Sequence, residues 1–141
     1  MNLTSWTLIP LSNTKTIDKR EGWADLYRSR GFNPIPVHYV REDGRCSCRS
    51  GSKCPSPGKH PAINWTRYQR VRVNDDDIKF WWEGESRRHG VGIITGSISG
   101  NVFVVDVDCG PGKDGDETID ALQRRYEDLP ETTTGLSLIH I

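Results

Sequence analysis

Three cysteines and one histidine lie close together in the chain, at Cys46, Cys48, Cys54 and His60. Five residues separate Cys48 from Cys54, and five more separate Cys54 from His60. Three thiolates and one imidazole form a closed tetrahedral Cys₃His set for zinc. The glycines and prolines of residues 46–60 bend the chain where no hydrophobic core could organise it, so we predict a structural Zn²⁺ site. The alternative is a group of free surface thiols.

Two carboxylates, Asp106 and Asp108, follow the apolar run of residues 102–105. Because side chains two apart on a strand share a face, we expect them to emerge together at the end of a buried central strand, residues 101–108. Such a pair is a natural site for Mg²⁺ or Mn²⁺. A D-x-D pattern also occurs by chance on solvated strand ends. Lys59 is a further candidate, as a phosphate contact, although a lone lysine in a loop is usually only solvated.

The elements that position these residues alternate between helix and strand. Apolar periodicity predicts helices over 18–30 and 119–126, and Asn74 with three following acids predicts a helix start that leads to an end near Gly84. Residues 32–40 are extended because Pro34 and Pro36 exclude helix. Residues 91–95 and 102–108 read as two strands of a hairpin. We therefore expect an α+β fold with a mixed β-sheet flanked by helices, preceded by a flexible extension at residues 1–17.

Charge is distributed unevenly although the net charge is zero. Residues 41–72 carry eight Lys/Arg against two acids, and residues 74–141 carry six against fourteen. A basic section can contact phosphates, and an acidic section can hold a divalent cation; two solvated faces of opposite sign are the simpler alternative. No apolar stretch approaches the roughly 20 residues of a membrane span, and no signal peptide is recognisable, so we expect a soluble cytoplasmic protein without a membrane partner. Four cysteines in such a protein are thiols or metal ligands.

Several motifs occur in an order that resembles a known family. The chain is similar to the amino-terminal domain of bifunctional DNA primase/polymerases, in the archaeo-eukaryotic primase superfamily, over about residues 20–135. The motifs are Gly31-Phe32 with Pro34 and Pro36, Gly58-Lys59-His60-Pro61 with Trp65, Trp81-Trp82, Gly90 to Gly96, and Val104-Val105-Asp106-Val107-Asp108.

The resemblance implies a function and its partners. Asp106 and Asp108 would be the first catalytic motif, binding Mg²⁺ or Mn²⁺ for nucleotidyl transfer on a DNA template and primer from nucleoside triphosphates. A cysteine-rich insertion also occurs in members of this family, which favours the zinc-knuckle interpretation of residues 46–60. Members are common in phages, plasmids and integrated elements, and we expect a helicase domain in the full-length parent of this chain.

The end of the sequence departs from the family pattern. Residues 132–135 resemble the approach to a later histidine motif, but residues 136–141 lack its glycines and match a translated sequencing adapter. We therefore expect residues 18–135 to be a partial primase/polymerase domain, residues 136–141 to be a non-native tail, and the chain alone to be inactive. The alternative is an authentic short terminal strand.

Two other functions compete with the enzyme hypothesis. A zinc-containing module could bind nucleic acid through the basic section without catalysis, leaving Asp106 and Asp108 structural. A D-x-D glycosyltransferase also holds the metal of a nucleotide, but it offers no account of the cysteines. Nucleotide binding that requires Mg²⁺ or Mn²⁺ and both aspartates separates the first hypothesis from the module.

Overall fold

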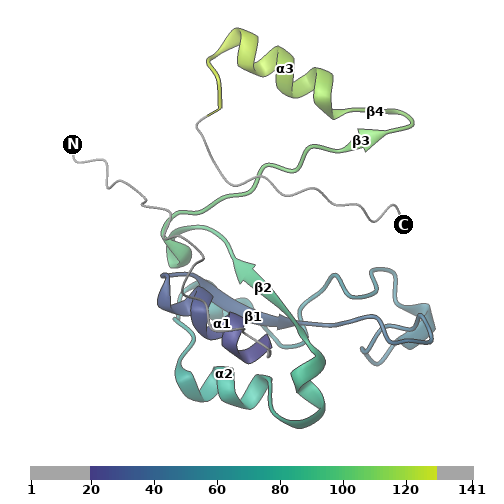
Figure 1. Cartoon of the computed structure of the whole chain (residues 1–141), viewed down its shortest axis with the longest axis vertical. Helices are drawn as coiled ribbons and strands as arrows, with labels where there is room; N and C mark the ends of the chain where they lie inside the picture. Colours follow the sequence, from purple (N-terminus) through teal and green to yellow (C-terminus); the bar gives the residue numbers. More distant parts are fainter. Residues whose placement is uncertain (1–19, 130–141) are drawn as a thin grey trace, which may run out of the picture. The chain divides into compact units, whose positions relative to one another are not determined.

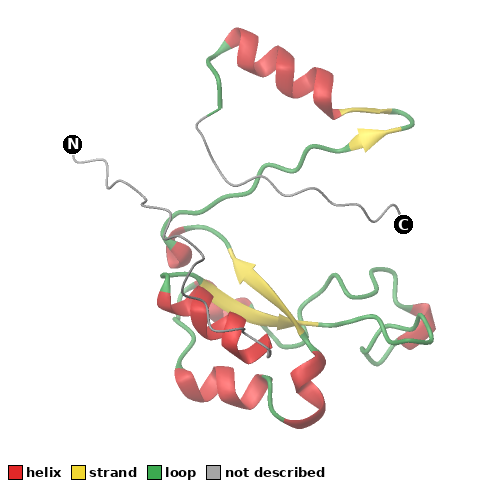
Figure 2. Ribbon diagram, viewed as in Figure 1, coloured by secondary structure: helices red, strands yellow, loops and turns green. Residues whose placement is uncertain are grey.

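A computed structural model of the chain describes residues 20–129, in which helices and short strands alternate (Figures 1 and 2). The predicted extension 1–17 and tail 136–141 lie outside these residues. The chain forms two compact units, with the boundary between Phe103 and Val104. The α+β class is confirmed, but the expected mixed sheet is wrong: the described residues form two separate two-stranded sheets, both antiparallel. None of the described helices is long and apolar enough to cross a membrane.

Helix α1, Arg20–Ser29, opens the first unit and confirms the predicted helix. Ala24 on its inner face is fully buried, and the helix packs against both strands of the first sheet and against the second helix. Gly31 ends it with a φ of 89°, and its N–H donates to Arg28 O at 2.9 Å. The left-handed backbone explains why glycine stands there.

Strands β1, Asn33–Val37, and β2, Gly90–Ile94, form the first sheet in antiparallel register, with Asn33 opposite Ile94 and Val37 opposite Gly90. The other edge of β1 is covered instead by the segment after His60, because Ala62 N donates to Pro36 O at 2.9 Å. A proline at such a position costs no ladder hydrogen bond to β2. The predicted extended segment is therefore confirmed, and β1 accommodates both prolines although a segment lies along each of its edges.

Helix α2, Asp75–Trp81, begins at the predicted N-cap. The Asn74 side chain accepts from Asp77 N at 2.8 Å, and the Asp77 side chain accepts from Asn74 N, which completes a capping box. The acids of the first turn also favour this end of the helix dipole. Four 3₁₀ turns complete the first unit: η2 Gly51–Lys53, η3 Thr66–Gln69, η4 Gly84–Arg88 and η5 Ser97–Ser99.

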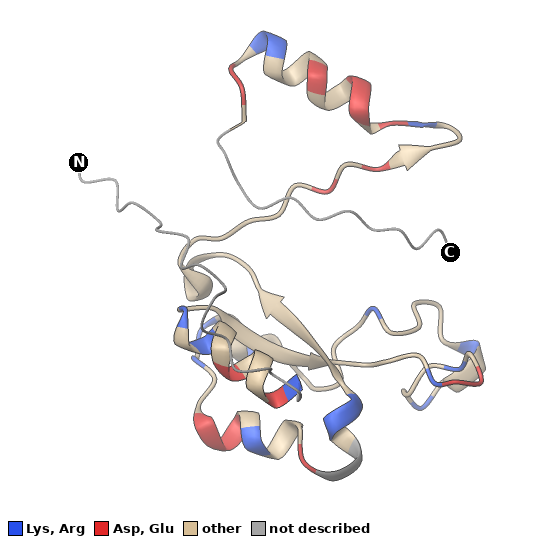
Figure 3. Cartoon of the chain, viewed as in Figure 1, with Lys and Arg blue, Asp and Glu red and all other residues tan. Residues whose placement is uncertain are grey.

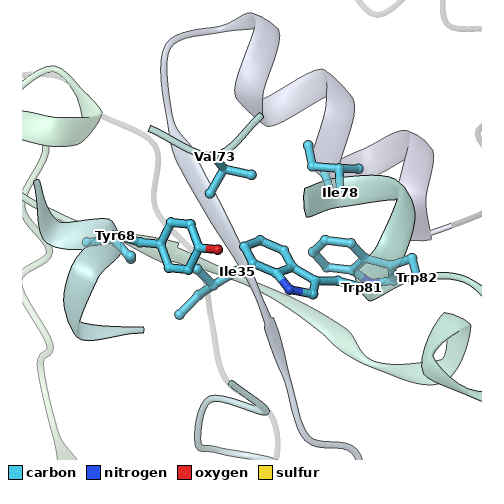
Figure 4. Packing of buried hydrophobic residues seen from close by; sticks show 8 residues of the cluster. Ile35, Tyr68, Val73, Ile78, Trp81 and Trp82 are labelled. Atoms are coloured by element: carbon cyan, nitrogen blue, oxygen red, sulfur yellow. The ribbon is translucent and has the colours of Figure 1, made fainter. Parts of the chain in front are cut away.

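The core of the first unit lies between these helices and the sheet, and Figure 4 shows its aromatic side chains meeting Ile35 of β1. The Tyr68 and Trp81 rings meet edge to face, with centroids 5.0 Å apart. Its buried members are Ala24, Ile35, Tyr68, Val73, Ile78, Trp81, Trp82 and Ile94.

One polar side chain, Asn33, is fully buried beside this core. Its Nδ2 donates to Tyr68 O at 2.8 Å and to Val71 O at 3.1 Å, and its Oδ1 accepts from Val73 N at 2.8 Å. The Asn33 amide thus holds the segment between η3 and α2 against β1.

The predicted central strand over residues 101–108 is wrong. Between β2 and β3, antiparallel pairing consists of a single bridge between Gly96 and Val102, and no described residue forms a β-bridge with residues 103–108. The side chains of Phe103 and Val104 are 77% and 76% exposed. A segment that is apolar on both faces becomes a buried strand only where other elements pair with its backbone and pack on its side chains. The segment's own sequence does not determine whether such elements are present.

The second unit begins at Val104 and contains strands β3, Cys109–Gly110, and β4, Lys113–Asp114, followed by helix α3, Gly115–Arg125. Residues 109–114 therefore form a minimal hairpin. Gly115 N donates to Asp108 O at 3.1 Å, so the backbone of Asp108 is attached to the start of α3. The predicted helix around Ile119 and Leu122 is confirmed.

Candidate metal centres

The first unit brings Cys46, Cys48, Cys54 and His60 together. One ligand atom from each residue lies within 4.8 Å of the others. His60 Nε2 is 3.6 Å from Cys46 Sγ and 3.4 Å from Cys54 Sγ. Zinc-ligand distances near 2.3 Å for sulfur and 2.0–2.1 Å for nitrogen give a sulfur to nitrogen separation of about 3.6 Å in a tetrahedron. The side chains are therefore spaced for a metal such as Zn²⁺.

Backbone turns set this spacing. Gly51 O accepts from both Cys46 N and Cys54 N at 3.3 Å, and Gly51 N donates to Cys48 O at 3.1 Å. Gly51 has a φ of 52°, a left-handed conformation that a residue with a side chain adopts at a cost. One glycine thus connects all three cysteines, which explains why the tight Cys-x-Cys pair can act with a third cysteine six residues later.

The end of β1 supports the cluster from both sides. Tyr39 O accepts from Ser47 N at 2.8 Å, and Val40 forms an antiparallel β-bridge with Cys46. These contacts hold the Cys46–Cys48 segment. His38 N donates to His60 O at 2.9 Å, which holds the segment that contains His60. The residues that follow β1 therefore fix the distance between the Cys46–Cys48 segment and His60.

Two side chains beside the ligands were not predicted as site residues. His38 Nδ1 and Ser47 Oγ share a hydrogen bond at 2.8 Å, and the His38 ring lies 4.5 Å from the His60 ring between centroids. Burial, with the nearby rings of His60 and His89, lowers the pKa of His38, so its ring is neutral at neutral pH. The only sequence signal for Ser47 was its place between two cysteines.

We expect Ser47→Ala to weaken zinc binding about tenfold, at the low end of the 10- to 100-fold that supporting residues typically contribute, because the Ser47 hydroxyl holds His38 and Tyr39 and contacts no ligand side chain directly. The Ser47 hydroxyl also accepts from Tyr39 N at 3.1 Å, so its loss frees both His38 and the strand end. Competition with a coloured chelator measures the affinity. Ser52→Ala in the same loop is the control, and equal affinities of the two variants would contradict a supporting role for Ser47.

The cluster favours deprotonated ligands. Burial of the Cys46 thiol alone raises its pKa, but hydrogen bonds from the N–H groups of Cys48 and Gly58 and from His60 outweigh it and lower the pKa to about 6. The same contact with Cys46 raises the pKa of His60. Without metal, the pair therefore approaches a thiolate beside an imidazolium.

Zinc affinity should consequently fall as the pH decreases through about 6. Below that value Cys46 gains a proton, and His60, whose pKa is raised, is already protonated. Both protons must leave before the side chains can bind metal. Chelator competition between about pH 8 and about pH 5 tests this expectation. A constant affinity over that range would exclude these ligands.

Lys59 lies in the same loop and its side chain is exposed. Its N–H donates to Ser56 O at 3.2 Å, and its ammonium forms no ion pair with any residue between 20 and 129. The cation is free to meet an anion from solution. Its phosphate contact remains a prediction.

Asp106 and Asp108 lie in the second unit, in the exposed extended segment before β3. Asp108 Oδ2 is 2.9 Å from Lys113 Nζ. Within residues 20–129, only the cysteine cluster groups three or more side chains that could hold a metal, so neither aspartate has a third ligand there. Cys109 is exposed and its thiol donates to Asp116 Oδ1 at 3.0 Å.

Comparison with known proteins agrees with the ordered motifs. The family model described as bifunctional DNA primase/polymerase, N-terminal, matches residues 4–138. No curated protein and no solved structure matches the chain significantly. Because the family model covers nearly the whole sequence, the chain belongs to the family of bifunctional DNA primase/polymerase N-terminal domains.

Proposed function

We propose that this domain serves template-directed nucleotidyl transfer, with Asp106 and Asp108 binding Mg²⁺ or Mn²⁺. The observation that carries the proposal is the D-x-D pair in a chain of the primase/polymerase family. DNA template, primer and nucleoside triphosphates are the substrates that follow. The family resemblance further suggests replication of a phage, plasmid or other mobile element, alongside a helicase domain.

The charge around the aspartates supports a cation there. The Lys113 ammonium lies against Asp108, so this carboxylate already attracts one positive charge. Both carboxylates are exposed and open to an incoming triphosphate. Bound Mg²⁺ or Mn²⁺ would neutralise the triphosphate and activate the primer 3′-hydroxyl. The aspartates would hold the cation, and Lys113, once displaced from Asp108, would be available to a phosphate oxygen.

The cysteine cluster has a structural part in this proposal. Zn²⁺ held by Cys46, Cys48, Cys54 and His60 would stiffen the loop that follows β1, with Lys59 at its surface. A closed Cys₃His set leaves no open position for a substrate. The zinc site therefore shapes the domain, and the chemistry belongs to the aspartates.

A nucleic-acid-binding module without catalysis is the second candidate. It is favoured because the four ligands of the cysteine cluster are already assembled, whereas the aspartates have no third ligand among the described residues. In that case zinc and the basic section would account for the whole function. The two candidates differ in whether nucleotide binding needs a divalent cation.

We expect the zinc-loaded chain to bind a fluorescent nucleoside triphosphate in the presence of Mn²⁺. Combining Asp106→Asn with Asp108→Asn should weaken this binding at least about tenfold, because the carboxylates hold the cation that meets the phosphates. Fluorescence anisotropy measures the affinity. The matched control combines Glu117→Gln with Asp120→Asn, which removes the same charge from exposed positions on α3. Binding that ignores both Mn²⁺ and the aspartates would favour the module.

A further inference from the structure

The basic section, residues 41–72, includes charges that neither metal centre uses. At its carboxyl end, turn η3 and the residues beside it line an open groove of about 650 Å³ in the first unit. Figure 3 marks in blue the positions of Lys and Arg along the backbone of this unit. The groove is lined chiefly by Ile63, Asn64, Arg67, Gln69, Arg70 and Trp81.

The cations of the groove are accessible. Arg67 and Arg70 are exposed and lie three residues apart on one short turn. The Arg67 guanidinium lies over the Tyr68 ring, 4.5 Å from its centroid, and 3.5 Å from Asp77 Oδ1, so it is held in place without being enclosed. Arg70 forms no ion pair with any described residue. Two guanidinium groups at one groove suit successive phosphates.

The remaining lining suits a flat, partly polar ring. Ile63 and the small exposed part of the otherwise buried Trp81 supply an apolar surface. The amide side chains of Asn64 and Gln69 can both donate and accept hydrogen bonds. A nucleobase has an apolar face and polar edges. In a double helix the faces are stacked and the edges are paired, so a protein can contact the face and the edge of one base together only in a single strand. An inorganic anion would use the arginines alone.

The groove is also connected to the zinc loop through the backbone. His60 O accepts from His38 N, and Ala62 N donates to Pro36 O, both at 2.9 Å. These bonds hold the residues between the ligand His60 and the groove residue Ile63 along β1. The wall of the groove is therefore anchored to β1 by backbone hydrogen bonds.

We propose that this groove binds a nucleotide unit of single-stranded DNA, with Arg67 and Arg70 on the phosphates and the base against Ile63 and Trp81. The inference rests on the proposed function, because it supplies a template contact for that reaction. It assigns the contact to the first unit and makes it independent of Asp106 and Asp108.

The test uses the zinc-loaded full chain and a labelled oligothymidine of about 12 nucleotides, a length within the range that single-strand sites cover. Anisotropy is recorded without Mg²⁺ or Mn²⁺ over a series of salt concentrations. Arg70→Ala should weaken binding several-fold and reduce the slope of log affinity against log salt by about 0.7, the value for one phosphate contact on a single strand. Adding Arg67→Ala should lower the slope by about 1.4 in all.

Arg30→Ala, singly and combined with Arg88→Ala, removes the same charge from exposed positions outside the groove. These controls should bind nearly as the unaltered chain does. Because Arg70 has no described ion-pair partner, its removal should leave the thermal unfolding curve unchanged. Gln69→Ala should weaken oligothymidine more than it weakens inorganic polyphosphate. Equal losses in groove and control variants, or equal losses for both ligands, would overturn the proposal.

The variant with Asp106→Asn and Asp108→Asn separates this inference from the proposed function. It should keep single-strand binding and lose Mn²⁺-dependent nucleotide binding. If the groove variants bind the strand normally while the aspartate variant loses nucleotide, the groove is wrong and the proposed function stands. If the aspartate variant keeps nucleotide while the groove variants lose the strand, the proposed function fails and the groove stands.

Discussion

Cys46→Ser should lower zinc affinity by roughly 70- to 900-fold. Structural zinc sites contribute roughly 10–16 kcal/mol in total, so one ligand of four accounts for about 2.5–4 kcal/mol. Cys46 is the buried ligand and lies 3.6 Å from His60 Nε2, so serine leaves a weak donor facing the centre. Elemental analysis of the purified chain and chelator competition measure the effect.

The control for this prediction is Cys109→Ser. Cys109 is exposed and contacts Asp116 instead of the cluster, so its loss should leave one zinc per chain and an unchanged affinity. Zinc content that is equal in the Cys46 and Cys109 variants would show that the metal is held elsewhere. A chain that contains no zinc in either variant or in the parent would leave free thiols as the correct interpretation.

Replacing Asn33 should cause the largest loss of folding stability. Asn33→Leu leaves the backbone groups of Tyr68, Val71 and Val73 without their partner, and the bonds to Tyr68 and Val73 are buried. Each unsatisfied group costs about 1–3 kcal/mol, and we expect a combined loss of about 3–5 kcal/mol in the free energy of unfolding. A domain of this size has about 5–15 kcal/mol, so the variant should be close to unfolding. Urea denaturation followed by tryptophan fluorescence measures the change.

Asn33→Asp tests the cause, because aspartate has nearly the same size. Its second oxygen would face the carbonyls of Tyr68 and Val71, which now accept from Nδ2. The loss should be at least as large as for leucine. Gln69→Leu, at an exposed amide side chain, should change stability by less than about 0.5 kcal/mol. A small effect of Asn33→Asp would mean that packing volume, not hydrogen bonding, makes the site sensitive.

Features with a local cause were predictable from the sequence. The α2 start follows from the Asn74 capping box, and the α1 end follows from the left-handed Gly31. The metal ligands were recognisable because few residue types bind zinc and four of them lie within a short segment. In each case the residues that determine the structure are neighbours in the chain.

Features that depend on distant partners were not predictable. The groups that satisfy the Asn33 side chain lie 35 to 40 residues away, so nothing beside Asn33 marks it as buried. The reverse error occurred at residues 103–108, where the local apolar pattern indicates a strand but pairing stops at Val102. Burial and pairing are properties of neighbours in space, which the local pattern does not specify.

The attachment of the zinc loop to β1 has a consequence for the order of folding. Val37 pairs with Pro61 within the loop region and with Gly90 in the sheet. Zinc bound to Cys46 and His60 would hold Pro61 close to Val37. The loop that must then close before β2 pairs with β1 runs from Pro61 to Gly90, which is about half as long as the loop from Val37 to Gly90. Halving a loop saves about 0.6 kcal/mol of closure entropy, which corresponds to a rate nearly threefold faster if pairing limits folding. Zinc should therefore accelerate refolding as well as stabilise the product.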